Sequence, residues 1–156
     1  MNTSNEIIVA NSKILKLNNV VSRAISAQDQ EEMQKTMQMF NSYFKSKMLI
    51  PYGPIIVHSK TSFNNGALSQ KTEMMVQVRE APDKIDAPYS FESHIRIENC
   101  VMARYCGDPM KVQMAYGKIQ VYAFENDVQL KDETYTVFVE QIEGVLNADV
   151  FVEVLK

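Results

Sequence analysis

The spacing of apolar side chains changes along the chain, and each change predicts a new element. Ile14–Ile25 alternates apolar and polar residues, with a bend or bulge at Asn18-Asn19, which predicts an interrupted strand. From Asp29, a plausible N-cap, apolar residues recur at steps of three and four, which is typical of an amphipathic helix. These residues are Met33, Met37, Phe40, Phe44 and Met48. Pro51-Tyr-Gly-Pro54 is predicted to end the helix.

Two strands are predicted after this helix. They lie at Ile55–Ser59 and Glu73–Arg79, with the turn signal Asn64-Asn-Gly66 between them. A stretch punctuated by prolines follows, and Ser93–Cys106 is again a strand. The residues before it, like residues 1–12, are expected to lie outside regular structure.

The second half of the chain repeats this order of elements. Gly107-Asp-Pro109 starts a second helix, and strands follow at Tyr135–Glu140 and Asp149–Leu155. At a shift of roughly 76 to 80 residues, Asp29 corresponds to Asp108 and Phe40 to Ile119. Residue types agree better than identities, as expected when two modules point their side chains the same way.

The repeated order predicts an α+β fold made of tandem, duplicated strand–helix–strand–strand modules. We expect an antiparallel sheet with the two main helices on one face and a central groove between the modules. One domain would span residues 1–156, with module 1 at 13–80, module 2 at 91–156 and a linker at 81–90.

Strand alternation sorts the side chains onto two faces. The residues predicted to face the helices are Ile55, Val57, Met74, Val76, Val78, Tyr135, Val137, Val139, Val150, Val152 and Val154. The residues predicted on the opposite face are Ile56, His58, Met75, Gln77, Arg79, Thr136, Phe138, Glu140, Phe151 and Glu153. That second face mixes aromatic, thioether and charged groups, whereas a face in contact with water alone would not need Phe138 or Phe151.

Composition and charge exclude several function classes. The chain has 156 residues, is 46% hydrophobic and carries a formal net charge of −3, with a pI near 5.4. It can bury a core, and it shows no basic surface of the kind that binds nucleic acid. No apolar run approaches the roughly 20 residues that span a bilayer, and the polar N-terminus lacks a secretory pattern. We therefore expect a cytoplasmic protein without direct nucleic-acid or membrane contacts.

Few residues are candidates for catalysis or metal binding. Cys100 and Cys106 lie roughly 20 Å apart along one predicted strand, which predicts two free thiols. His58 and His94 are the two imidazoles, and neither belongs to a metal-ligand or triad-like motif. We predict no catalytic residue, no metal and no cofactor. His58 fits either a groove or a partly exposed strand position.

The face opposite the helices predicts a binding site. Contact area would come from Tyr52, Ile56, Met75, Phe138 and Phe151. Polar specificity would come from Arg104, Glu140 or Glu153, with His58 and Thr136 on the same face. A carboxylate beside aromatic rings would favour a cationic or hydrogen-bonding ligand, whereas the alternative is two glutamates that point into water.

The duplicated plan, with Val101-Met-Ala-Arg-Tyr-Cys-Gly-Asp-Pro109 before the second helix, resembles the GyrI-like family of effector-binding domains. The resemblance covers about residues 13–156. At the start of the second helix, the family has a glycine followed by a proline or an aromatic residue, and Gly107 and Pro109 match this pattern. The strand after the second helix usually carries, in the family, an acid followed two residues on by an aromatic. Here Thr136–Phe138 matches without the acid, and Glu140 is the nearest substitute. The chain also has no Trp.

This resemblance implies a stand-alone, non-enzymatic module that binds a small, partly apolar ligand in the groove between the repeats. The alternative is a protein–protein interaction module, an inhibitor, adaptor or chaperone, that uses the same exposed apolar face. A weaker alternative is a hydrolase, because some proteins that resemble this family are described as hydrolases. The ligand, the partner and the oligomeric state stay open.

Overall fold

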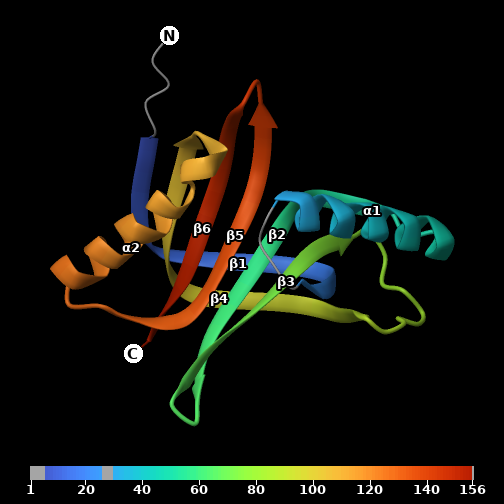
Figure 1. Ribbon diagram of the computed structural model, residues 1–156, viewed down its shortest axis with the longest axis horizontal. Coiled ribbons are helices and arrows are strands. Elements are labelled where there is room, and N and C mark those ends of the chain that lie inside the picture. Colours follow the sequence, from blue (N-terminus) through green and yellow to red (C-terminus); the bar gives the residue numbers. More distant parts are fainter. Residues whose placement is uncertain (1–5, 26–29, 156) are drawn as a thin grey trace. The chain divides into compact units, whose positions relative to one another are not determined.

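The chain folds into six strands and two α-helices in a computed structural model, which describes residues 6–25 and 30–155 (Figure 1). In chain order the elements are β1 (Glu6–Ile25), α1 (Gln30–Lys47), β2 (Pro51–Asn64), β3 (Ala67–Val78), β4 (Tyr89–Gly107), a 3-10 turn (Pro109–Lys111), α2 (Gln113–Glu125), β5 (Gln129–Ile142) and β6 (Val145–Leu155). The strands pair antiparallel. The predicted α+β class is confirmed.

These elements form two compact units, named here after their helices. The α1 unit is Lys16–Ile95, and the α2 unit is Met1–Leu15 with Arg96–Lys156. In the α1 unit β3 pairs with β1 and β2, and in the α2 unit β6 pairs with β4 and β5. Element order and pairing are therefore the same in both units. Duplication, the module boundaries 13–80 and 91–156, and a central groove stay predictions.

Helix α1 follows the predicted apolar stripe with one exception. Phe40 and Phe44 are buried, and Met33 and Met37 pack at the edge of the same cluster. Met48 comes after the last helical residue, has a φ of 57° and is 89% exposed. Its left-handed backbone ends the helix and turns its side chain out of the stripe, so its predicted place there is wrong. The predicted cap, Asp29, lies outside the described residues.

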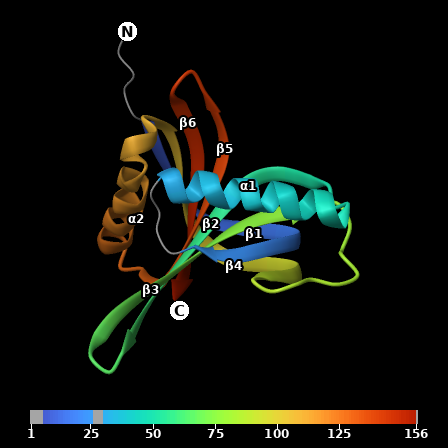
Figure 2. The same ribbon diagram turned by 45° about the vertical axis from the view of Figure 1, so that its right-hand side comes forward.

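Asp108 caps the second helical segment. Its Oδ1 accepts a hydrogen bond of 2.9 Å from the backbone N–H of Met110, at the start of the 3-10 turn. Pro109 follows, at a position where a missing N–H costs nothing. The α-helix itself begins at Gln113 and runs alongside the strands of its own unit (Figure 1, Figure 2).

The strands are longer than their alternation suggests. Residues 1–12 are expected outside regular structure, yet β1 begins at Glu6, so this expectation is wrong from that residue on. Ile7 and Val9 pack against the core of the α2 unit, which explains the extra length of the strand. Asn19, at the predicted bend, has a φ of 50°.

Each unit joins its last two strands through the same kind of two-residue turn. Asn65-Gly66 has φ values of 53° and 77°, and Glu143-Gly144 has values of 51° and 79°. Two left-handed residues define a type I′ turn, whose twist matches that of the strands. The sequence signals the first turn through Asn-Gly. The second is harder to foresee, because a glutamate seldom adopts this backbone conformation.

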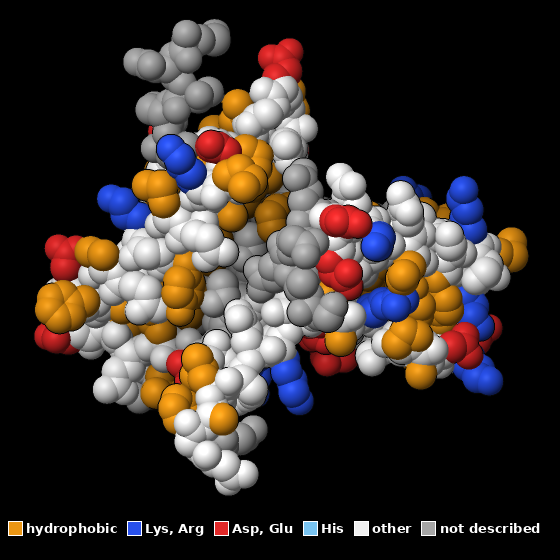
Figure 3. Space-filling view, viewed as in Figure 1, with side chains coloured by type: hydrophobic (Ala, Val, Ile, Leu, Met, Phe, Trp, Pro, Cys, Tyr) orange, Lys and Arg blue, Asp and Glu red, His pale blue; other side chains and the backbone are white. Residues whose placement is uncertain are grey.

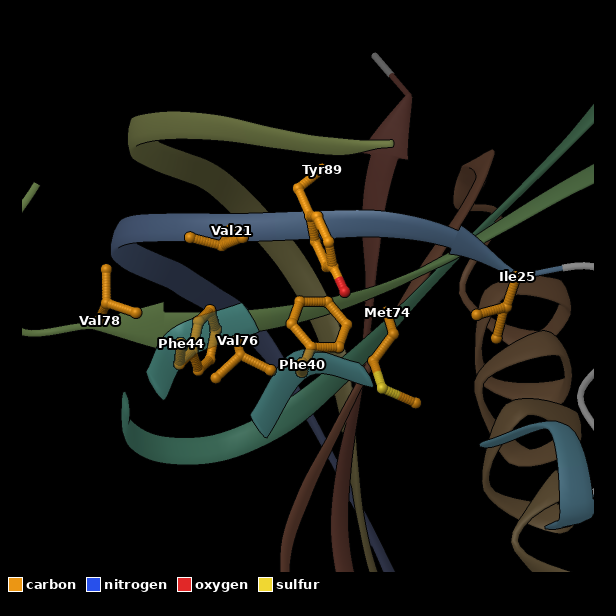
Figure 4. Close-up of a cluster of buried hydrophobic side chains, with 8 residues drawn as sticks. All are labelled: Val21, Ile25, Phe40, Phe44, Met74, Val76, Val78 and Tyr89. Atoms are coloured by element: carbon orange, nitrogen blue, oxygen red, sulfur yellow. The ribbon is translucent and has the colours of Figure 1, made fainter. Parts of the chain in front are cut away.

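The two cores lie between each helix and its sheet. The core of the α1 unit consists of Val21, Ile25, Phe40, Phe44, Met74, Val76, Val78 and Tyr89 (Figure 4). The core of the α2 unit consists of Val101, Ala103, Tyr105, Ala115, Ile119, Val150 and Val152. The predicted helix-facing residues of β3 and β6 are thus confirmed.

Candidate functional site

The strands of each unit have a second face, turned away from the unit's own helix, which we call the distal face. Residues directly opposite in an antiparallel pair lie on the same face. Met74 packs with α1, so alternation and register define the distal face of the α1 unit. Its members include Tyr52, Ile56, His58, Glu73, Met75 and Gln77. The predicted face is confirmed for Ile56, His58, Met75 and Gln77.

The strand β5 points its side chains the other way from the prediction. Thr136 lies opposite Val150, which belongs to the α2 core, and Phe138 follows two residues later. Both residues therefore belong to the helix-covered face, and their predicted place beside Phe151 is wrong. The register of β5 shifts on both sides of this segment. A strand with apolar residues on both faces carries no sequence signal of such shifts.

β5 presents Tyr135 on the distal face instead, opposite Phe151. Glu133 precedes Tyr135 by two residues and lies within the register shift between Leu130 and Thr134, so alternation does not assign its side chain to a face. Glu133 and Tyr135 are also an acid followed two residues on by an aromatic, a spacing that is visible in the sequence. The match of Thr136–Phe138 to the GyrI-like pattern stays a prediction.

An ion pair lies on the distal face of the α2 unit. Arg104 Nε donates to Asp149 Oδ1 at 3.0 Å, and Arg104 Nη2 donates to Oδ2 at 3.2 Å. The two side chains differ in exposure, 63% for Arg104 against 14% for Asp149. The hydrogen bond that Arg104 donates to Asp149 raises the pKa of Arg104. Asp149 is missing from the predicted site because the sequence does not show that the pairing of β4 with β6 brings Arg104 opposite it.

Apolar side chains lie on one side of this ion pair. Met102, Phe151 and Tyr135 stand opposite one another across β4, β6 and β5. Met102 and Phe151 are buried and Tyr135 is half-buried. The distal face therefore places a half-buried carboxylate, that of Asp149, beside a thioether and two aromatic rings.

A second ion pair lies beyond these residues. Lys131 Nζ is 3.0 Å from Glu153 Oε2, with side chains 40% and 29% exposed. Glu153 lies opposite Cys100. Burial, together with the charge of Glu153, raises the pKa of the Cys100 thiol to about 11, so this thiol stays protonated near neutral pH. Cys100 and Cys106 are both free, as predicted.

The remaining predicted residues lie at edges or in the other unit. Glu140 lies opposite Asn147 on the distal face and is exposed. In the α1 unit, His58 Nδ1 and Glu73 Oε1 are 3.0 Å apart. Tyr52 is 37% exposed near the start of β2, where the register shifts.

Three apolar residues of the distal faces are buried. Ile56 is 0% exposed, Met75 4% and Phe151 8%. An exposed apolar face is the basis for docking a partner protein, and this expectation is wrong for these three residues. The more exposed members of the distal faces include Tyr52 and the charged residues Arg104 and Glu140.

The comparisons identify the fold. No protein-family model matches the chain, and no curated protein matches it in sequence. Among solved structures, the crystal structure of the EcmrR C-terminal domain is similar over 100% of this chain and 99% of that one, with a TM-score of 0.63 and 13% identity. The chain shares the fold of that domain.

Two further structures have the same fold. EcmrR in the cryo-EM structure of an EcmrR–DNA complex matches 97% of this chain, with a TM-score of 0.65 and 11% identity. This chain spans 58% of that EcmrR chain. A hydrolase from Listeria innocua matches 99% of this chain and 94% of its own, with a TM-score of 0.53 and 11% identity. At such identities the similarity concerns the fold alone.

Two further observations concern metal binding and membrane-spanning helices. Residues 6–25 and 30–155 contain no group of three or more His, Cys, Asp or Glu side chains placed to hold a metal ion. No helix within these ranges has the length and apolar character needed to cross a bilayer.

Proposed function

We propose that this chain is a small-molecule binding module, and that its ligand is a partly apolar cation bound on the distal face of the α2 unit. The observation that carries the proposal is the unequal exposure of the Arg104–Asp149 ion pair, 63% against 14%. A ligand cation that displaces the guanidinium would keep the Asp149 carboxylate paired and would place its apolar part beside Met102 and Phe151.

The energetics of burial favour a positively charged ligand. A carboxylate withdrawn from water without a partner is costly, so whatever displaces Arg104 has to supply a charge or strong hydrogen-bond donors. Arg104 is mostly exposed and regains water when it is released. The rings of Phe151 and Tyr135 would add cation–π contacts of about 0.5–2 kcal/mol.

The proposed ligand residues combine predicted and newly found positions. Arg104, Phe151 and Glu153 are kept from the sequence-based site. The residues added from strand register are Met102, Tyr135 and Asp149. A part in binding for Glu140, and for Tyr52, Ile56, His58 and Met75 of the α1 unit, stays a prediction.

A pair of matched ligands tests the charge requirement. The probes are a naphthylmethyl trimethylammonium salt and its neutral carbon isostere, each added during thermal unfolding. We expect the cation to raise the melting temperature and the isostere to raise it much less, because a ligand that binds the native state stabilises it. A charged and an uncharged probe with equal effects would contradict the proposal.

The substitution Asp149→Asn tests whether the Asp149 carboxylate binds the cation. It should weaken binding of the cation by about tenfold or more, since it removes the charge and leaves the shape of the side chain. Asp127→Asn is the matched control, because Asp127 is exposed in the turn before β5, and its φ of 53° suits asparagine. Equal losses in the two variants would argue against this site.

The other functions have less support. A partner polypeptide would need a broad exposed apolar surface, more than a small ligand beside Asp149 needs, and Ile56, Met75 and Phe151 are buried. A hydrolase has support from similarity of fold alone. A cytoplasmic location stays a prediction.

A further inference from the structure

A separate hollow lies on the helix side of the α1 unit. Its volume is about 470 Å³, and it is lined by Arg23, Lys35, Gln38, Met39, Ser42 and Tyr89. The four residues from α1 are spaced i, i+3, i+4 and i+7, so they form one face of the helix. Figure 3 shows Lys or Arg side chains next to hydrophobic ones beside α1. The volume is in the range of small-ligand sites.

Arg23 is held in place by an aromatic ring. It lies in β1 opposite Met74, on the helix-covered face. Its Nη1 donates to Tyr89 Oη at 3.2 Å, and its guanidinium carbon lies 5.3 Å from the centre of the Tyr89 ring. Tyr89 in turn stacks on Tyr43, with ring centres 4.1 Å apart, and meets Phe40 edge-on at 5.3 Å. These contacts orient the guanidinium before any ligand arrives.

The hollow carries positive charge that its own lining does not neutralise. None of its six lining residues is acidic. Arg23 has no carboxylate partner among residues 6–25 and 30–155. Lys35 forms a long ion pair of 3.5 Å with Glu31, and both side chains are largely exposed. A guanidinium has five N–H donors in a planar fork that fits a carboxylate, and Tyr89 uses one of them.

We propose that this hollow binds a small aromatic carboxylate. The carboxylate would pair with Arg23, with Lys35 nearby, and the ring would lie against Tyr89 and Met39. Gln38 and Ser42 supply further hydrogen-bonding groups. The proposal is independent of the proposed function, because it concerns the other unit and a ligand of opposite charge.

Titration calorimetry on the full chain tests the proposal with three probes. They are 2-naphthoate, the neutral 2-naphthamide and inorganic phosphate. We expect naphthoate to bind at least about tenfold more tightly than either other probe, because only naphthoate combines the charge with the ring. Equal binding of the amide would remove the case for an anion site, and equal binding of phosphate would remove the case for an aromatic ligand.

Variants then locate the site. Ser42→Glu adds a carboxylate to the hollow at an exposed helix position and should weaken naphthoate binding at least about tenfold. Asn41→Glu adds the same charge to the neighbouring exposed position outside the lining and should leave the affinity within about twofold.

Arg23→Gln should also weaken naphthoate binding, and Ser42→Glu keeps the test valid if Arg23→Gln does not fold. The proposal is overturned if naphthoate does not bind to the unsubstituted chain. It is also overturned if Ser42→Glu and Asn41→Glu change the affinity equally.

Discussion

The buried core of the α1 unit contains the large rings of Phe40, Phe44 and Tyr89, whereas that of the α2 unit contains the ring of Tyr105 together with the small side chains of Ala103 and Ala115. Element order and strand pairing are nevertheless the same in both units. The topology therefore depends on alternation and turns, and cores of different side-chain size satisfy it. The difference predicts which substitutions each unit tolerates.

The largest effect is expected from removing a ring in the α1 unit. Phe40 is 0% exposed and contacts Phe44 and Tyr89, with ring centres 5.6 and 5.3 Å apart. Phe40→Ala should lower the free energy of unfolding by about 3–5 kcal/mol, measured by urea denaturation. Phe124→Ala is the control, since Phe124 is 86% exposed on α2, and it should change this free energy by less than about 0.5 kcal/mol. Similar losses would mean that the rings do not form the core.

The next largest effect on the free energy of unfolding is expected when a small buried side chain of the α2 unit is replaced by a larger one. Ala115 is 0% exposed in the core of the α2 unit, so Ala115→Leu should lower the free energy of unfolding by about 1–3 kcal/mol through overpacking. Gln120→Leu adds a similar side chain at an exposed position of α2 and should change it by less than about 0.5 kcal/mol. If Ala115→Leu stabilised the chain, this core would contain unfilled space.

The two hairpins allow a reciprocal exchange. Glu143 has the same left-handed backbone as Asn65, with φ values of 51° and 53°. Glu143→Asn should raise the free energy of unfolding by about 1 kcal/mol, and Asn65→Glu should lower it by about the same amount. Thermal unfolding of both variants measures the exchange. Changes of the same sign would show that the turn backbone is not the cause.

The smallest effect concerns the connection between β3 and β4, which carries Asp86. Lys47 Nζ lies 2.7 Å from Asp86 Oδ2, and Tyr43 Oη donates to the same oxygen at 3.1 Å. These contacts, that of Lys47 first, lower the pKa of Asp86 from its usual 3.8. A pKa that is lower in the folded state adds stability above the unfolded-state value, and this stability is lost as the pH falls through the lowered pKa.

Asp86→Asn should therefore reduce the loss of stability on acidification. The measurement is the urea midpoint at about pH 6 and about pH 3, for this variant and for the exposed control Asp83→Asn. The difference should be small and should shrink in high salt, because the pair is solvent-accessible. The same loss in both variants would contradict the assignment to Asp86.

The sequence predicts the order of the elements because periodicity is a local property. The steps from Met33 to Phe44 predict α1, and the alternation of Val150, Val152 and Val154 predicts the helix-facing side of β6. Local patterns do not report register. Thr136 and Phe138 were assigned to the wrong face because both faces of β5 carry apolar residues, and its register shifts are visible in the structure alone.

The candidate site was predictable in part. Phe151 and Glu153 follow from alternation along one strand. Asp149 gains its importance from Arg104, which is far away in sequence and is brought opposite by the pairing of β4 with β6. The sequence does not show how exposed each carboxylate is, whereas the structure distinguishes the half-buried Asp149 from the exposed Glu140.

The central claim, that the distal face of the α2 unit binds a lipophilic cation, is tested most directly by NMR of methionine methyl groups. Met102 lies on this face opposite Phe151, whereas Met39 is 44% exposed on α1. Titration with the naphthylmethyl trimethylammonium salt should shift the Met102 methyl resonance and leave that of Met39 unchanged. A titration that leaves Met102 unchanged, or that shifts the exposed Met39 instead, would contradict the account.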